Sequence, residues 1–400
     1  SKKALAIIFC TVFLDLIGFG MILPLNPFLA RHFGASAFEV GVLSSIYSIS
    51  QFLFSPFWGR LSDRWGRRPI ILICLLGVSL SYLFFAWANQ LWLLFLSRAL
   101  AGFFGASIST ASAYIADVTS RENRSKNMGL IGAAFGIGFI VGPVFGGVLG
   151  EIGLRLGLPE RAAMSLPAYG AFILCFLNFL AAIRFLHESL PLEKRSGIVR
   201  KPRWDTMIIQ LRRPIVGELL ILTFATIFAM ALMEAMLFLF VADKFGFSQV
   251  QASYAFGYVG VMIAFTQGYL IRKLLPRFGE NRLLLAGSVF MGIGLGLIGL
   301  SHSVSMLACA VTVLALGSGF TSPSILGCLS LLSKGDEQGE VLGVNQSLSA
   351  LGRIFGPMCG GWLFAHFGVP TPFLAGSAVA FLASGLVFIH FKKFPASAKA

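Results

Sequence analysis

Four ionisable side chains lie within long apolar runs of the sequence: Asp15, Arg98, Glu234 and Arg353. Apolar runs of this length predict membrane spans, and a charged side chain inside a membrane is energetically expensive. Such residues face the interior of a helix bundle, where they pair with an opposite charge, become neutral or bind a polar ligand. The chemistry that they indicate is therefore proton exchange or ligand binding inside a membrane.

Asp15 and Arg98 come first because the sequence places them at a similar depth. Counted from Lys3, Asp15 lies about 18 Å into the membrane at the helical rise, close to the midplane. The position of Arg98 within its own run gives about 20 Å from the same face. A cation at this depth can bias the proton affinity of the acid, so we predict that both residues couple to protons and line a cavity. The alternative for Asp15 is a structural salt bridge.

Glu234 and Arg353 lie in later apolar runs of the chain. Either they pair with each other or one of them binds a ligand, and the sequence leaves both interpretations open. Asn26 and Phe238 are the remaining residues that we expect to line the same cavity, together with Asp15 and the two cations.

Other kinds of chemistry find no support in the sequence. The five His are scattered, and the six Cys lie in apolar stretches without a CxxC pair, so we expect neither a metal site nor a disulfide framework. No G-x-x-x-x-G-K-[ST] phosphate loop, nucleophile elbow or His-Glu-x-x-His is present. We therefore expect a protein that is not an enzyme and has no cofactor.

The elements that position these residues follow from composition. Hydrophobic residues make up 56% of the chain and charged residues only 12%, about half the charged share of soluble domains. The apolar runs are continuous and lack the alternation of lipid-facing strands, which favours helices over a barrel. An all-α integral membrane protein with twelve spans is predicted, near 4–30, 37–58, 69–88, 91–115, 127–150, 164–186, 215–242, 248–271, 283–301, 304–332, 340–366 and 371–391.

The positive charges give the orientation of these spans. Twelve spans place both termini on one side, and 25 of the 31 Lys and Arg fall on that side. Because cytoplasmic loops carry the excess of Lys and Arg, both termini are expected in the cytoplasm. The net charge of +14 is then a topology signal, and no nucleic-acid partner is expected.

An internal duplication divides the spans into two halves. An offset of 212 to 214 positions carries Phe33-Gly34 onto Phe245-Gly246, and Gly142-Pro143 onto Gly356-Pro357. A constant offset over such a distance is hard to obtain by chance. We expect two pseudo-symmetric six-helix halves, 1–186 and 215–400, joined by a cytoplasmic linker at 187–214, with a site at their interface.

Two local patterns invite a packing or topology interpretation. The loop from Gly59 to Pro69 reads GRLSDRWGRRP, and composition alone makes it an orientation signal. The fifth span carries small residues at helical spacing, which permit close helix contact. The helix-packing residues that we predict are Gly138, Gly142, Pro143, Gly146 and Gly147, with Gly356 and Pro357 in the eleventh span.

The order of residues in that loop resembles the G-x-L-x-D-R-x-G-R-R loop of the major facilitator superfamily, and the match is complete. The Gly-Pro-x-x-Gly-Gly pattern of the fifth span is similar to a motif of the superfamily's antiporters. The segments around Asp15 and Arg98 also resemble its span-1 and span-4 motifs. The resemblance extends over essentially the whole chain, and it is strongest for bacterial drug/proton antiporters related to tetracycline exporters.

This resemblance implies alternating access by rocking of the two halves, with spans 1, 4, 7 and 10 lining the cavity. It implies proton entry in exchange for exit of an amphipathic small molecule, across the bacterial inner membrane. It also implies a charge cluster that closes the cytoplasmic side, in which Asp117 pairs with Arg67. The expected gating residues are Gly59, Asp63, Arg64, Gly66, Arg67, Arg68 and Asp117.

The chain departs from the tetracycline exporters because spans 8 and 9 lack the His and the acid of those proteins. Uptake or export of an anionic metabolite, siderophore or lysolipid is the second interpretation, and Arg353 would then favour the anion. A non-transporting assembly factor or receptor is the third. We expect a monomer whose partners are the small-molecule substrate, protons and the lipid bilayer.

Overall fold

The computed structural model describes residues 2–119, 124–191, 193, 195, 203–333 and 337–395. Within them the chain is helical and contains no strand. Positions 192, 194 and 196–202 of the predicted linker lie outside the described residues. The prediction of an all-helical protein is confirmed.

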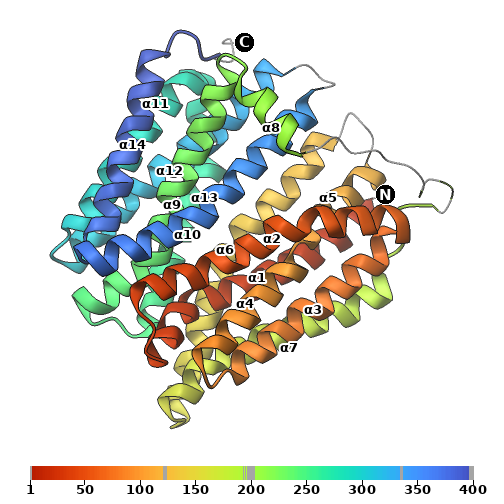
Figure 1. Cartoon of the computed structure of the whole chain (residues 1–400), viewed down its shortest axis with the longest axis vertical. Helices are drawn as coiled ribbons and strands as arrows, with labels where there is room; N and C mark the ends of the chain where they lie inside the picture. Colours follow the sequence, from red (N-terminus) through yellow and green to blue (C-terminus); the bar gives the residue numbers. More distant parts are fainter. Residues whose placement is uncertain are drawn as a thin grey trace. The chain divides into compact units, whose positions relative to one another are not determined.

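The six spans predicted before the linker are present as long helices (Figure 1). The fourth of them is interrupted at Ala106, where one helix ends and the next begins. The elements are α1 (Lys2–His32), α2 (Ala37–Trp65), α3 (Arg67–Trp87), α4 (Leu91–Gly105), α5 (Ser107–Val118), α6 (Arg124–Arg155) and α7 (Glu160–Phe185).

The second part of the chain begins with a short helix that the sequence analysis did not predict. It precedes six further spans, the second of which passes through a π-helical turn into the third. The elements are α8 (Arg203–Leu211), α9 (Val216–Phe245), α10 (Gln249–Phe265), η3 (Thr266–Leu270), α11 (Ile271–Leu300), α12 (Val304–Leu332), α13 (Gln338–Phe367) and α14 (Thr371–Ile389).

The described helices account for the twelve spans. Ten helical stretches are long and apolar enough to cross a membrane, and one of them, Gln249–Leu300, has 52 residues. That stretch is long enough for two crossings, and it bends at Gly279, where the backbone leaves helical geometry. Helix α13 adds a 30-residue span whose polar side chains lower its hydropathy. The twelve-helix architecture is therefore confirmed.

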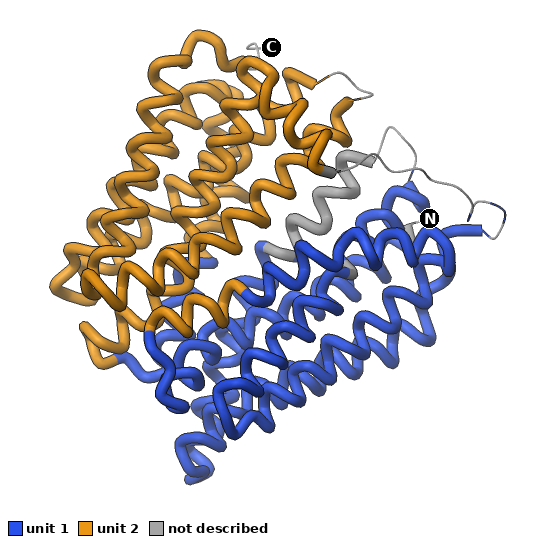
Figure 2. Tube along the Cα trace, in the orientation of Figure 1, with its two compact units in different colours: residues 1–36, 46–199, 247–260 blue, residues 37–45, 200–246, 261–400 orange. Residues whose placement is uncertain are grey.

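Contacts divide the chain into two compact units (Figure 2). Unit 1 comprises residues 1–36, 46–199 and 247–260, and unit 2 comprises 37–45, 200–246 and 261–400. Each unit thus includes a short segment from the other side of the linker. The division into halves at 1–186 and 215–400 stays a prediction.

Backbone geometry repeats at the positions that the duplication relates. Gly66, between α2 and α3, has φ 102° and ψ 162°. Gly279, at the bend of α11, has φ 75° and ψ 166°. Both conformations have positive φ, which glycine adopts without the strain that a side chain would cause. The two glycines therefore make the same kind of turn in both parts of the chain.

The predicted glycines lie at close helix crossings in unit 1. A methyl group on Gly138 would lie 2.8 Å from Leu16 Cβ, and one on Gly142 would lie 2.7 Å from Gly20 Cα. Gly146 faces the backbone of Met21 in the same way. Helices α1 and α6 therefore approach each other too closely for any side chain along this line.

The other packing residues make equivalent crossings. Gly147 lies against Ser253 of α10 in unit 1, and a methyl group on it would lie 3.2 Å from Ser253 Cβ. In unit 2, a methyl group on Gly356 of α13 would lie 2.8 Å from the Phe228 carbonyl oxygen of α9. Pro143 and Pro357 lie inside α6 and α13, so both crossings use a helix that contains a proline.

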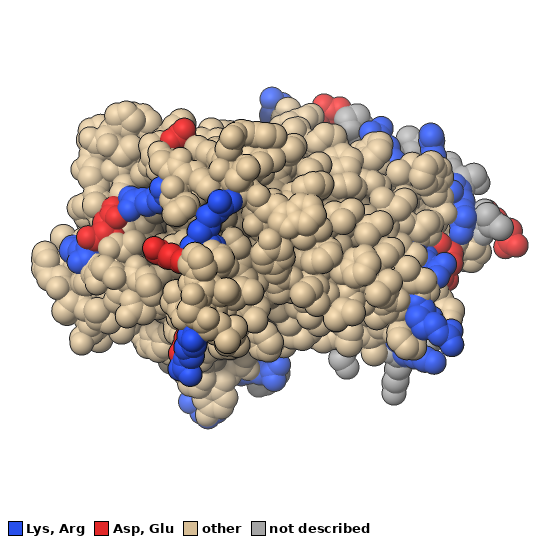
Figure 3. Space-filling view, turned by 90° about the horizontal axis from the view of Figure 1, so that it is seen from below, with Lys and Arg blue, Asp and Glu red and all other residues tan. Residues whose placement is uncertain are grey.

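Charged side chains are distributed as a membrane requires. On the face shown in Figure 3, much of the surface carries no Lys, Arg, Asp or Glu side chain, and the charged side chains occupy separate patches. Large hydrophobic residues with exposed side chains, such as Phe84, Leu177 and Phe381, lie on the spans. A surface of this kind is compatible with lipid and not with water.

Candidate functional site

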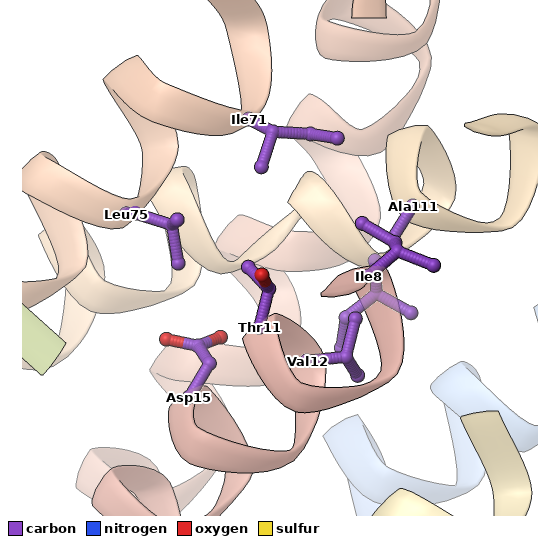
Figure 4. Close-up of a pocket in the computed structure, with 8 residues that line it drawn as sticks. Ile8, Thr11, Val12, Asp15, Ile71, Leu75 and Ala111 are labelled. Carbon is purple, nitrogen blue, oxygen red and sulfur yellow. The ribbon is translucent and has the colours of Figure 1, made fainter. Parts of the chain in front are cut away.

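Asp15 lies in an apolar pocket of unit 1. The pocket is formed by α1, α3 and α5, and its other lining residues are Ile8, Thr11, Val12, Ile71, Leu75, Ile108 and Ala111. Figure 4 shows the Asp15 carboxylate and the Thr11 hydroxyl on α1, with Leu75 and Ile71 of α3 beside them. An acid with so few polar neighbours is stabilised in its neutral, protonated form.

Helix α7 fixes the position of α1 at this depth. The side-chain amide of Asn178 donates a hydrogen bond of 2.8 Å to the Thr11 carbonyl. The Cys175 thiol lies 4.0 Å from Asp15 Oδ1. Gly18 lies against both Cys175 and Tyr82, so a side chain on Gly18 would push α1 away from α7 and α3. The carboxylate is therefore held by a tightly packed helix.

Arg98, on α4, is held by aromatic rings. Its side chain is 3% exposed, and its guanidinium carbon lies 4.8 Å from the ring centre of Tyr47 and 5.4 Å from that of Phe19. Phe19 also contacts Phe139, with ring centres 5.8 Å apart. Within the described structure, Nε and Nη1 of Arg98 have no hydrogen-bond partner. The cation is therefore stabilised by π faces, and two of its nitrogens are left to bind an acceptor.

Asp15 and Arg98 belong to the same unit but do not touch. Among the described residues, no salt bridge joins these two side chains. The pocket of Asp15 and the aromatic surroundings of Arg98 are built from different residues. An effect of Arg98 on Asp15 would therefore be exerted across space, and it stays a prediction.

Unit 2 contains the second pair of candidates. Glu234 on α9 is half-buried, Arg353 on α13 is exposed, and the charge of Arg353 acts on the carboxylate of Glu234. Asn26, on α1 of unit 1, is buried, and its Oδ1 has no hydrogen-bond partner within the described structure. Phe238, one turn after Glu234, is buried on α9. The role of these four residues in a substrate cavity stays a prediction.

The end of α2 and the start of α3, which are separated by Gly66, carry a buried ion-pair cluster. Arg67 Nη1 donates to Asp63 Oδ1 at 2.5 Å and to Ser62 Oγ at 2.7 Å. Arg67 Nε donates to Asp117 Oδ2 at 3.1 Å, which is the pairing that the family resemblance implied. Two carboxylates on one buried guanidinium tie the end of α2 to the end of α5.

The other residues between Gly59 and Pro69, which were predicted as a loop, are helical apart from Gly66 and have different surroundings. The Arg68 guanidinium donates to the carbonyl oxygens of Ile183 and Leu186, at 2.8 and 2.7 Å, and so satisfies the C-terminal end of α7. Arg64 is exposed, whereas Gly59 is buried and its carbonyl accepts a hydrogen bond from Ser62.

The sequence analysis missed two residues that complete this cluster. Glu188 accepts hydrogen bonds from the backbone N–H groups of Arg67 and Arg68, at 2.8 and 3.2 Å, at the positive end of α3. Arg195 donates to the Trp65 carbonyl at 3.0 Å and lies 3.6 Å from Glu188. Both belong to the segment read only as a linker, and the acid directly after an apolar span was the available signal.

The described sites contain an acid in apolar surroundings and a cation beside aromatic rings. In the described part of the chain, no three His, Cys, Asp or Glu side chains gather into a group that could hold a metal ion. Arg98 offers free donors beside aromatic rings.

The chain has clear relatives among known proteins. Its sequence matches the profile of the Major Facilitator Superfamily over residues 8–278 and 270–400. It is 33% identical over 367 residues to the class C tetracycline resistance protein of Escherichia coli, covering 90% of this chain and 89% of that protein. It is 30% identical over 401 residues to multidrug resistance protein 2 of Bacillus subtilis (strain 168), covering 98% and 96%. A solved structure of the human organic anion transporter MFSD10 (TETRAN) is similar, with a TM-score of 0.71, 25% identity and coverage of 96% and 99%.

Proposed function

Because the chain belongs to the major facilitator superfamily, we propose that it exports an amphipathic small molecule in exchange for protons. The names of its relatives, which include tetracycline and multidrug resistance proteins, support export of a drug-like compound. Halves 1–186 and 215–400 rock about the linker at 187–214, and a monomer in the inner membrane, with both termini in the cytoplasm, carries out the cycle.

The single observation that carries this proposal is the Asp15 pocket. Asp15 lies on α1 in a pocket that is lined mainly by apolar side chains. Among the residues that line this pocket, Thr11 is the only other one with a polar side chain. A carboxylate in such a place releases its proton when a polar or cationic group arrives and rebinds it when the group leaves. Substrate and proton therefore alternate on the same half of the protein.

Arg98 and its rings suit the other end of an amphipathic substrate. Phe19 and Tyr47 offer ring faces, and Nε and Nη1 of Arg98 offer two donors to a carbonyl, hydroxyl or phenolate oxygen. A planar compound with an acceptor oxygen satisfies both features. Arg98 also biases the proton affinity of Asp15 through its charge.

The charge cluster at the α2–α3 loop serves as the cytoplasmic gate. Arg67 holds Asp63 and Asp117, and Glu188 holds the start of α3, so the cytoplasmic ends of α2, α3 and α5 move together. A rigid group of helix ends is what rocking of a half requires.

An anionic substrate is the second candidate. Arg353 is exposed, Arg98 has free donors, and the similar human protein is an organic anion transporter. Arg353, whose charge acts on Glu234, would then favour the anion.

The test starts from purified protein and a panel of amphipathic aromatic cations and anions, ranked by thermal shift. We expect the best compound to release protons from the wild type and not from Asp15→Asn. In proteoliposomes, its transport should follow an imposed pH gradient and be lost in Asp15→Asn and Arg98→Ala. Glu160→Gln, which changes an exposed acid at the start of α7, is the matched control and should transport normally. Unchanged proton release in Asp15→Asn would refute the proposal.

A further inference from the structure

Helix α8 is a short amphipathic helix at the start of unit 2. One face packs against α9 and α13. Met207 is 9% exposed and belongs to a hydrophobic cluster with Val216 of α9 and Val341 of α13. The buried Gln210 donates to Glu340 Oε1 at 3.3 Å. This face fixes the helix to the end of unit 2 at which α9 begins (Figure 1).

The opposite face of α8 exposes large apolar side chains. Trp204 is 57% exposed, Ile208 is 47% exposed and Ile209 is 58% exposed. Trp204 and Ile208 are one helical turn apart, and the exposed Arg212 follows one turn later. Asp205 is also exposed on this side. Tryptophan and isoleucine side chains beside an arginine are the composition of a helix that lies in a membrane interface.

The joint between α8 and α9 fixes the direction of this face. Ile215 has φ 66°, ψ −49°, and among the described residues it alone has positive φ without being glycine. The Val216 N–H donates to the Pro214 carbonyl at 2.7 Å, which closes a γ-turn of the strained hand. Gly217 leaves no room for a side chain against the Leu211 carbonyl. Strain of this kind persists where the surrounding structure requires it, and here it orients α8.

We infer that the exposed face of α8 binds the anionic phospholipid surface of the cytoplasmic leaflet. The inference rests on the cytoplasmic placement of the linker in the proposed function. Trp204, Ile208 and Ile209 enter the interface, and Arg212 binds the lipid phosphates, because the cytoplasmic leaflet carries the negative surface charge. The lipid thereby holds the joint through which the linker meets α9, the helix of Glu234.

Quenching of tryptophan by brominated lipid tests this inference on the full-length protein. Vesicles contain phosphatidylcholine and phosphatidylglycerol in a fixed ratio, and only one of the two lipids is brominated. The Trp204 signal is the difference between the wild type and Trp204→Phe. We expect stronger quenching by brominated phosphatidylglycerol, and a loss of about fivefold in this preference in Arg212→Gln. Asp205→Asn should increase the preference.

Trp87 provides a matched control. It is 58% exposed and is the last residue of α3, at the end of that helix away from Arg67. The signal removed by Trp87→Phe should therefore show no preference between the two lipids. Quenching of Trp204 by iodide and by neither lipid would overturn the inference, as would equal quenching by both lipids. Disulfide dimers of Ile209→Cys that protect Trp204 at high protein density would instead identify a second copy. None of these readouts depends on transport, so a failed Asp15→Asn test leaves them interpretable.

Discussion

The glycine crossings allow a test in which two similar substitutions should change the stability of the protein in opposite directions. A methyl group on Gly142 would lie 2.7 Å from both Gly20 Cα and the Ile17 carbonyl oxygen, about 1 Å closer than an ordinary contact. Because both neighbours are backbone atoms of α1, no side chain can rotate away. Gly142→Ala must therefore separate α1 from α6, and overpacking of this kind costs about 1–3 kcal/mol.

Gly136, on the same helix, has no neighbouring atom within 4 Å of such a methyl group. Gly136→Ala should stabilise the protein by about 0.5–1 kcal/mol, because alanine loses less backbone entropy in a helix. The assay is thermal unfolding of the two variants in detergent, followed by transport in proteoliposomes. Gly142→Ala should unfold at lower temperature than the wild type and also transport more slowly, since Ile17 is two residues from Asp15. Equal stability of the two alanine variants would refute the crossing geometry.

Two further predictions concern the cations. Asp63→Asn should destabilise the protein by about 3–5 kcal/mol, and Asp117→Asn by about 1–2 kcal/mol, because Asp63 is the closer and more deeply buried partner of Arg67. Thermal unfolding gives the order, and the reverse order would contradict the described cluster. Tyr47→Leu should remove the cation–π contact with Arg98, lower the stability of the protein by about 1–2 kcal/mol and slow proton-coupled transport. Tyr47→Phe keeps the ring and should retain most of the stability and of the transport rate. Equal losses in the two variants would assign the effect to the hydroxyl group.

The spans and the packing glycines were predictable because each is determined by residues that lie close together in the sequence. A run of about 20 apolar residues specifies a span regardless of its partners. A glycine four residues from another marks a face that can approach a second helix, and the offset between Gly142 and Gly356 predicts that both parts of the chain use it. The bend at Gly279 lies between the predicted spans 248–271 and 283–301, although the helix continues on either side of it.

The partners of the buried charges were not predictable in the same way. Arg98 depends on Tyr47, which lies on another helix, and depth alone suggested Asp15 as its neighbour. Glu188 was missed because it accepts hydrogen bonds from backbone N–H groups, which every residue except proline carries and which a pattern of side chains therefore does not indicate. Helix α8 was missed because nine residues are too few for a periodic signal beside a polar linker.

The duplication constrains packing more strongly than chemistry. At a glycine crossing the backbones of two helices are in contact, so an added side chain destabilises the protein at each such crossing. Gly142 and Gly356 make equivalent backbone contacts in the two parts of the chain. An ionisable group does not depend on such a contact between two backbones, so it need not be repeated in the other half. Glu234 accordingly corresponds to the apolar Ile22 in the first half. Gly356→Ala should therefore destabilise the protein as Gly142→Ala does, with Gly343→Ala, which meets no neighbouring atom, as its control. Asp15→Asn and Glu234→Gln should differ in their effect on proton release, because Asp15 lies in an apolar pocket, whereas the charge of Arg353 acts on Glu234.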